Sequence, residues 1–324
     1  MIEESIVQNA RGYNSWPFVG TIGDVLVCMY SRGEVHRIDE RCRGVYARTS
    51  RDGGRTWEQE TTVVNTPDYC ESAIGKGRDE DGALLLWVRC IGDDVCHALY
   101  RSRDGKSFER IALLRPNPMP MQITDVFHVP GVGLMSLWFS GHYRDLPENS
   151  WGTLASSDNG MTWRQTTVED RLMKYEWPTE PSCAYLGGGR ILAVARSEAL
   201  DDIPERRQFQ LQSTDYGATW TKAATNIRDV SQSTPSLVLS SDGSVVRNYY
   251  YHRGRGELKC RTAAVGSVWD APMNWPEPEI VAHGSADAHH AGNVNASGST
   301  NCDFCTFYSG NERKTDVVCV RVPR

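Results

Sequence analysis

One stretch, Ser157-Asp158-Asn159-Gly160-Met161-Thr162-Trp163, recurs in four versions along the chain. The other versions are Ser50-Arg51-Asp52-Gly53-Gly54-Arg55-Thr56-Trp57, Ser102-Arg103-Asp104-Gly105-Lys106-Ser107-Phe108 and Ser213-Thr214-Asp215-Tyr216-Gly217-Ala218-Thr219-Trp220. A degenerate fifth version without the Asp occupies residues 262–269. The Asp positions 52, 104, 158 and 215 follow one another at a nearly constant spacing. Such a period predicts a repeat architecture in which each copy belongs to one supersecondary unit.

Each version is predicted to form a β-turn that its own side chains stabilise with hydrogen bonds. Asp followed by Gly suits the positive-φ positions of a hairpin, and the short carboxylate can accept backbone N–H groups across the turn. The Thr then begins the outgoing strand, and the Trp supplies a large apolar surface to the next unit. The motif resembles the Asp-box of the sialidase superfamily, which implies a β-propeller with these turns on its rim, away from the active site.

A second periodicity marks the first strand of each unit. The equivalent pairs are Trp16-Pro17, Glu71-Ser72, Asp125-Val126, Glu180-Pro181, Thr234-Pro235 and His289-His290. Six equivalent positions predict an all-β, six-bladed propeller that forms one domain over residues 1–324. The N-terminal segment is expected to complete the last blade and so to remove the free edges. Because inner strands converge on one axis, the first residue of each pair is expected to face a common mouth.

Near-continuous apolar runs identify the second strand of each blade. They are residues 25–30, 83–88, 134–139, 191–195 and 245–251. Apolar residues at consecutive positions indicate a strand covered on both faces, as in a blade packed between two others. No amphipathic helix longer than two turns is predicted.

Composition narrows the range of partners. The chain has 324 residues and a net charge of −6, with no basic block, so neither nucleic acid nor an anionic membrane is an expected partner. There is no stretch of 18 apolar residues, and the first five residues form no leader, so we expect a cytoplasmic protein or secretion without a signal peptide. Most of the ten cysteines lie in apolar strand patterns and are expected to be buried free thiols. Cys302 and Cys305 form a lone C-x-x-C motif, for which no zinc site is expected.

Several of the apolar second strands end in Arg. They end at Arg32, Arg89, Arg196 and Arg253. Arg binds a carboxylate through two parallel hydrogen bonds, so several Arg side chains around one mouth favour an anionic ligand. The alternative is that each Arg is solvated or pairs with a neighbouring acidic residue.

The resemblance extends to site residues in two blades. Thr179-Glu180-Pro181-Ser182 followed by Ala195-Arg196 is similar to the sialidase pattern, in which the Glu polarises a Tyr nucleophile and the Arg holds the sugar carboxylate. The strand that ends at Arg32, followed by Asp39, is similar to the family's first blade. There the resemblance implies that Arg32 is a carboxylate ligand and Asp39 is the acid/base. His36 and Glu40 compete with Asp39 for that role.

The chain departs from the family pattern at two places. Ser15-Trp16-Pro17 stands where the family has Arg-Ile-Pro, so the first Arg of the triad is missing unless Arg11 replaces it. The expected Tyr near position 284 is absent, which leaves Asp287, one of the tyrosines at 249–251, or a water molecule as the nucleophile. Arg253 is the preferred third Arg, ahead of Arg247 and Arg255.

The histidines and aromatic residues leave further alternatives. His289 and His290 with His36 and Asp125 suggest a metal site, but neighbouring histidines on a strand point to opposite faces, so neither a metal nor a cofactor is expected. His128 and His142 are expected to be ordinary strand and loop residues. Trp16, Trp177, Tyr143 and Tyr185 are candidates for a rim on which a sugar stacks, or for packing between blades.

Together these patterns predict a glycoside hydrolase of sialidase type that cleaves an acidic sugar, sialic acid or a related one, from a glycan. The alternatives are a polysaccharide lyase that acts on uronates and a non-catalytic glycan-binding propeller. The expected catalytic residues are Asp39, Glu180, His36, Asp125, Glu71 and His289. The expected substrate-binding residues are Arg32, Arg196, Arg253, Trp16 and Asp287.

Overall fold

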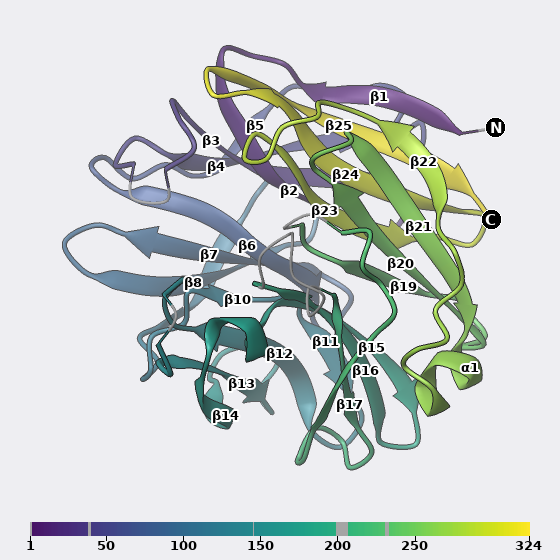
Figure 1. Cartoon of the computed structure of the whole chain (residues 1–324). Helices are drawn as coiled ribbons and strands as arrows, with labels where there is room; N and C mark the ends of the chain where they lie inside the picture. Colours follow the sequence, from purple (N-terminus) through teal and green to yellow (C-terminus); the bar gives the residue numbers. More distant parts are fainter. Residues whose placement is uncertain (1, 38–39, 145, 199–206, 231–232) are drawn as a thin grey trace.

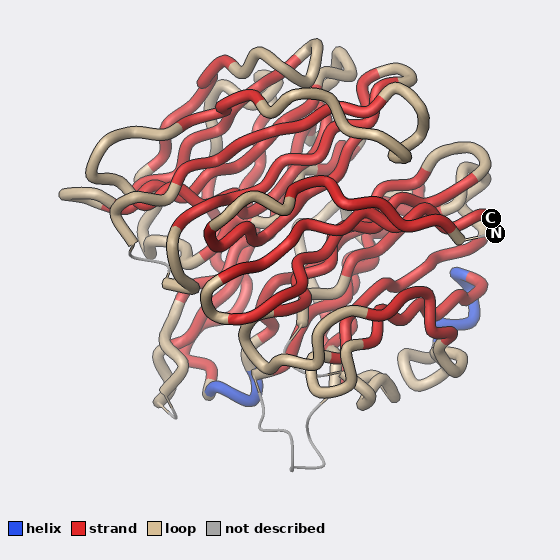
Figure 2. The backbone as a smooth tube through the Cα atoms, turned by 90° about the horizontal axis from the view of Figure 1, so that it is seen from above, coloured by secondary structure: helices blue, strands red, loops and turns tan. Residues whose placement is uncertain are grey.

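Antiparallel strands follow one another along the whole chain. The computed structural model describes residues 2–37, 40–144, 146–198, 207–230 and 233–324. Figure 1 shows the sheets arranged around a common centre, with β2, β6, β15, β19 and β23 near it and β5, β14 and β22 toward the rim. Figure 2 shows how little helix accompanies them. The predicted all-β propeller is confirmed.

Four of the sheets stand separately. The first contains β6 (Cys70–Arg78), β7 (Leu84–Ile91), β8 (Val95–Ser102) and β9 (Glu109–Leu114). The second contains β10 (Gln122–Ile123), β11 (Phe127–Val129), β12 (Gly133–Ser140), β13 (Asn149–Ser156) and β14 (Arg164–Leu172). The third contains β15 (Pro178–Gly187), β16 (Arg190–Ser197), β17 (Phe209–Ser213) and β18 (Thr221–Ala224). The fourth contains β19 (Ser236–Leu239), β20 (Val245–His252), β21 (Glu257–Ala264) and β22 (Glu279–His283).

The remaining sheet joins the two ends of the chain. It contains β2 (Gly12–Ile22), β3 (Val25–Gly33), β4 (Gly44–Ser50) and β5 (Thr61–Val64) together with β23 (Ala291–Gly298), β24 (Cys302–Asn311), β25 (Lys314–Pro323) and β1 (Glu3–Gln8). β1 pairs with β25 in antiparallel fashion, so the first and last strands lie side by side (Figures 1 and 2).

The prediction of six separate blades is wrong. Over the residues that the structure describes, four sheets of four or five strands are separate, and the fifth sheet has eight strands. The cause is a short parallel pairing between β2 and β25, at Gly12 with Lys314 and Tyr13 with Thr315. The side-chain amide of Asn14 strengthens this join by donating a hydrogen bond to the Thr315 carbonyl oxygen at 2.8 Å. The hydrogen bonds therefore merge the first and last sets of strands into one sheet.

The apolar second strands form the core between neighbouring sheets. In β7, Leu86 packs with Val27 and Met29 of β3, whereas Trp87 packs with Trp138 of β12 on the opposite face. Successive side chains of one strand thus serve two different inter-sheet clusters. Each such fully buried side chain contributes about 1.5–3 kcal/mol of hydrophobic stabilisation, which explains the uninterrupted apolar run.

The Asp-containing turns are locked as their sequence predicts. The Asp158 carboxylate accepts hydrogen bonds from the backbone N–H of Thr162 at 2.8 Å and from its hydroxyl at 2.6 Å. Ser156 donates its hydroxyl to Asp158 and accepts the N–H of Gly160, whose φ is 91°. Asp52, Asp104 and Asp215 make corresponding bonds. The degenerate fifth copy has no Asp and instead forms the end of β21 and the helix α1 (Val265–Asp270).

We predict that Asp158→Asn lowers the free energy of unfolding by about 1 kcal/mol at pH 7, because the exposed turn loses charge-assisted hydrogen bonds. The Thr162 hydroxyl and N–H hold the pKa of Asp158 below its usual value. Their stabilisation is therefore complete above the unfolded-state pKa and is lost as the pH falls through the folded-state pKa. Urea unfolding at pH 7 and below pH 3 measures this. The control is Asp170→Asn, which makes the same change at an exposed position. An equal loss of stability in Asp158→Asn at both pH values would contradict the charge-based account.

Candidate functional site

A cavity of about 490 Å³ is lined by residues from four of the sheets and by Thr234, Pro235 and Arg253, which directly flank β19 and β20 of the fifth. Its charged or ionisable lining residues are Arg89, Lys174, Arg196, Arg253, Asp125, Glu180, Glu198, His36 and His289. The aromatic residues Trp16 and Tyr143 also line it. A volume of this order accommodates a small ligand, and none of the four Asp-containing turns contributes to the lining.

Three bulged strands direct side chains into this cavity. Trp16, Glu180 and Asn293 have φ angles of 48°, 49° and 48°, in the left-handed region that non-glycine residues rarely occupy. Each lies where the register of its strand shifts, in β2, β15 and β23 respectively. Such backbone strain costs about 1–3 kcal/mol per residue and concentrates at functional sites. All three residues line the cavity.

These bulges also correct the predicted alignment of the last unit. Asn293, not His289, is the residue of β23 that corresponds to Trp16 and Glu180. His289 precedes the strand and still reaches the cavity from a turn. The constant spacing placed this position four residues too early, at His289, which lies in the turn before β23.

The cavity brings together seven of the predicted site residues. They are Trp16, His36, Asp125, Glu180, Arg196, Arg253 and His289. Arg32, Glu71 and Asp287 do not line it. Asp39, the predicted acid/base, lies outside the described residues.

Glu71 serves a loop rather than the cavity. Its side chain is 2% exposed and accepts the backbone N–H and the hydroxyl of Thr66 at 2.9 and 2.7 Å. Burial raises the pKa of Glu71. The expectation that it faces the mouth is therefore wrong, and β6 presents Ser72, Ala73 and Ile74 instead.

Arg32 also does not face the cavity, because it is paired with Glu60. Its two terminal nitrogens donate to the two oxygens of Glu60 at 2.7 and 2.9 Å, and its guanidinium lies 4.1 Å from the centre of the Tyr46 ring. This is the bidentate geometry predicted for a substrate carboxylate, but the carboxylate belongs to the protein. The sequence pattern placed Arg32 in the mouth because Glu60, 28 residues away, could not be recognised as its partner.

Arg196 joins two carboxylates at the cavity wall. One terminal nitrogen donates to Glu180 at 2.8 Å and the other donates to one oxygen of Glu198 at 2.9 Å, while Nε forms an ion pair with the other Glu198 oxygen, also at 2.9 Å. Glu198 also accepts the hydroxyl of Thr179 at 2.6 Å. Burial alone disfavours the charge of Arg196, but Glu198 and Glu180 raise its pKa above the usual value.

Glu198 is the site residue that sequence reasoning missed. It directly follows β16. A signal was present, because Glu198 lies two positions after Arg196 and alternate residues of an extended chain point to the same side. The arrangement uses every side of the Arg196 guanidinium, so it is not an open fork for a ligand carboxylate.

Asp125 and Arg253 are also bound by their neighbours. Asp125 accepts the backbone N–H of Lys76 at 2.9 Å and the side-chain amide of Asn295 at 3.3 Å. Arg253 donates to the Ala288 carbonyl at 3.1 Å and to the Asn293 side-chain oxygen at 2.5 Å. Both side chains thus connect neighbouring sheets at the cavity.

Asp287 holds a turn instead of facing the cavity. One of its oxygens accepts the backbone N–H groups of His289 and His290 at 2.8 and 2.9 Å. This bonding fixes the segment that carries His289 into the cavity. Asp287 therefore supports the site without lining it.

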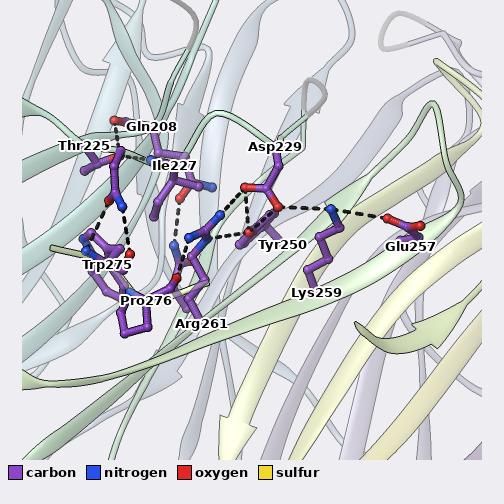
Figure 3. A network of polar contacts seen from close by, with 12 residues as sticks. Gln208, Thr225, Ile227, Asp229, Tyr250, Glu257, Lys259, Arg261, Trp275 and Pro276 are labelled. Carbon is purple, nitrogen blue, oxygen red and sulfur yellow. Dashed lines mark hydrogen bonds and ion pairs between the residues drawn. The ribbon is translucent and has the colours of Figure 1, made fainter. Parts of the chain in front are cut away.

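The alternative tyrosine nucleophiles lie in the core. Tyr249, Tyr250 and Tyr251 are each 0% exposed and line no part of the cavity. Their hydroxyls donate to Asp303, Asp229 and the Ser285 carbonyl, and Figure 3 shows Tyr250 within the Asp229 network. They are not placed to attack a ligand.

Tyr308 is a further tyrosine next to the site. It is 0% exposed, donates to the His289 carbonyl at 3.1 Å and packs edge-on against the Tyr13 ring at 5.9 Å. Burial raises the pKa of Tyr308, and Glu180 raises it further. Sequence reasoning did not single it out because it lies within an apolar strand.

His36 lies in an aromatic cluster at the cavity edge. Its ring is 5.3 Å from Tyr13, 5.8 Å from Trp16 and 5.7 Å from His290. Burial lowers the pKa of His36 to about 4, and the nearby positive charge of Arg253 contributes. The imidazole is therefore neutral at pH 7 and can act as a proton acceptor.

His36, His289 and His290 are not part of a three-residue group of possible metal ligands within the described part of the chain. The group of three possible metal-ligating residues found there is Glu34, Glu40 and Cys42, which includes no histidine. Glu40 accepts the backbone N–H of Glu34 and pairs with Arg43, so it is occupied within its own loop.

We predict that the His36 imidazole titrates with a midpoint near pH 4 in NMR spectra of the folded protein. Unfolded His binds its proton first as the pH falls from 6.5, so this group should reduce the stability progressively between pH 6.5 and about 4. Arg253→Gln should raise the midpoint, because it removes a neighbouring positive charge. A midpoint near 6.5 in the unchanged protein would contradict the burial of His36.

The candidate aromatic rim is only partly assembled. Trp16 and Tyr143 line the cavity, and Tyr143 is 49% exposed. Trp177 is 0% exposed and packs beneath Tyr143 with the ring centres 5.7 Å apart. Tyr185 does not line the cavity. Trp177 therefore supports Tyr143 as an exposed aromatic face.

Comparison with known proteins agrees with the propeller fold. Residues 147–275 match the family of BNR repeat-like domains. A Dyadobacter fermentans protein of unknown function is similar over 99% of both chains, with a TM-score of 0.79 and 16% identity. No curated protein is significantly similar in sequence.

Two sialidases of known structure share the same architecture. The Trypanosoma rangeli sialidase in complex with sialic acid has a TM-score of 0.68 and 12% identity, over 98% of this chain and 55% of that one. The NanB sialidase from Streptococcus pneumoniae, as its K499G mutant, has a TM-score of 0.72 and 12% identity, over 98% and 70%. The chain thus spans about half of the trypanosomal enzyme. At these identities the likeness shows the fold.

The described helices are too short and too polar to cross a membrane.

Proposed function

We propose that this chain, whose fold is the BNR-repeat propeller of the sialidase superfamily, is a glycoside hydrolase that acts on an acidic sugar. The observation that carries the proposal is the pair of carboxylates, Glu180 and Glu198, held by one Arg at the wall of the cavity. Glycosidases use a carboxyl group as acid and a carboxylate as base or nucleophile, and the fixed Glu180 can supply the second of these. The sialic acid complex of the trypanosomal sialidase supports the choice of substrate class.

In the proposed reaction, Glu180 takes a proton from a water molecule. The water oxygen then bonds to the anomeric carbon, while the glycosidic carbon–oxygen bond breaks and its oxygen takes a proton from an acid. We assign that acid to Asp39, because it follows His36 closely in the chain and His36 lines the cavity. Glu198 positions Arg196, which in turn orients Glu180.

This route is a single displacement without a protein nucleophile. It is supported by the absence of Tyr from residues 284–287 and by the burial of the tyrosines at 249–251. Tyr308 lies close to Glu180 but is buried and donates its hydroxyl to a backbone carbonyl. The first-formed sugar should therefore have inverted anomeric configuration in NMR spectra, and a retained anomer would rule this route out.

A negatively charged substrate is proposed because several cationic side chains line the cavity. Arg89, Lys174, Arg196 and Arg253 all line it. A panel of chromogenic glycosides of sialic, uronic and neutral sugars tests the proposal. Aglycone release from an acidic glycoside supports it, whereas release from none of them, or from neutral glycosides alone, contradicts it.

A polysaccharide lyase is the second candidate, and the observation that favours it is the neutral His36. An imidazole with a pKa of about 4 can accept a proton from the carbon next to a uronate carboxylate. The same panel separates the two reactions, because a lyase forms an unsaturated product that absorbs ultraviolet light. New absorbance with uronate polymers would favour the lyase.

A further inference from the structure

Among the described residues, Arg89 is the cavity arginine without a hydrogen-bond or ion-pair partner. It follows the buried residues 84–88 of β7 and lines the cavity beside its cross-strand neighbour Ser72. No hydrogen bond or ion pair of its guanidinium is found among the described residues, and its buried Nε is unsatisfied. Burial lowers the pKa of Arg89, and no Asp or Glu contributes to that shift.

The other two cavity arginines have hydrogen-bond or ion-pair partners within the protein. Arg196 is saturated by Glu180 and Glu198. Arg253 donates both terminal nitrogens to the Ala288 carbonyl and to Asn293. A partly buried cation without a counter-charge is costly in a folded protein, so an anion that reaches Arg89 gains more than one that approaches a neutralised arginine.

The surroundings of Arg89 suit a sugar that carries such an anion. Tyr143 is near enough to influence the pKa of Arg89, and its half-exposed ring lines the same cavity. Tyr143 is also near Glu198, Arg196 and Glu180, which all affect its own pKa. One aromatic side chain is thus near both the unpaired arginine and the paired carboxylates.

We propose that Arg89, and not Arg196, binds the carboxylate of the acidic sugar, while Tyr143 covers the sugar ring. This assignment takes its ligand class from the proposed function but concerns binding alone. A carboxylate fits because the guanidinium offers two parallel donors in one plane. Sulfate esters present related oxyanions and are included in the test.

The test is calorimetric titration of the complete protein with sialic acid, glucuronic acid, neutral glucose and glucose 6-sulfate. Arg89→Gln should weaken the binding of the carboxylated sugar by about 10- to 100-fold, the range for hydrogen bonds to a charged group. Arg89→Lys should lose part of that affinity, because Lys keeps the charge without the fork. The control is Arg110→Gln on the exposed face of the same sheet, which should bind like the unchanged protein.

Each result decides the assignment. Equal binding of carboxylated sugars by the unchanged protein and Arg89→Gln overturns it, as does binding of no carboxylated sugar by the unchanged protein. Arg89-dependent binding of the sulfated sugar alone overturns the choice of carboxylate. Arg89-dependent binding without any cleavage contradicts the proposed hydrolase and leaves this assignment standing. Cleavage of acidic glycosides with an unchanged KM in Arg89→Gln supports the proposed hydrolase and overturns the assignment of Arg89.

Discussion

Glu180→Gln is expected to lower kcat/KM for an acidic glycoside by about 10²- to 10⁴-fold, the contribution of a positioned general base. Gln keeps the size of the side chain and an oxygen that can accept the hydrogen bond from Arg196, but it cannot take a proton. The fall should therefore appear in kcat with little change in substrate affinity. Steady-state kinetics together with calorimetric binding measures both quantities.

The matched control is Glu279→Gln, which makes the same chemical change at an exposed position of β22. It should retain full activity. A thermal unfolding curve for each variant separates loss of chemistry from loss of folding. Glu180→Gln with undiminished kcat would remove Glu180 from the reaction, whatever its position in the cavity.

Arg196→Met is expected to lower the free energy of unfolding by about 3–5 kcal/mol at neutral pH. The physical reason is that Glu180 and Glu198 would remain as two neighbouring carboxylates without their shared counter-charge, and the Glu198 side chain is only 3% exposed. Met preserves most of the packing volume. Urea unfolding measures the difference, and activity should fall as well because Glu180 loses its orientation.

Arg196→Lys should lose less stability but still lose activity, by about 2–3 kcal/mol of transition-state binding, because one ammonium cannot hold both carboxylates in a plane. The charge-based account has a direct test in the triple variant with Glu180→Gln and Glu198→Gln. Removing all three charges should recover much of the stability lost in Arg196→Met. No recovery would show that the loss came from packing.

Local features were predictable from the sequence. Each hydrogen bond of the Asp158 turn joins residues no more than four positions apart, so these bonds could be inferred from the stretch itself. The apolar runs likewise indicated strands covered on both sides, as Leu86 and Trp87 illustrate. The count of separate blades failed because it depends on one short pairing between β2 and β25, at opposite ends of the chain.

The sequence by itself therefore determined the propeller, its locked turns and the residues from which a polar mouth could be built. Only the tertiary structure decided which arginines are available to a ligand. Arg32 pairs with Glu60 and Arg196 with Glu180 and Glu198, whereas Arg89 pairs with no described residue. These strand-end arginines look alike in sequence. Whether the charge of each arginine is compensated depends on which acidic side chains lie near it. Strand register, bulges and the packing of neighbouring strands set those distances, and no local sequence pattern encodes them.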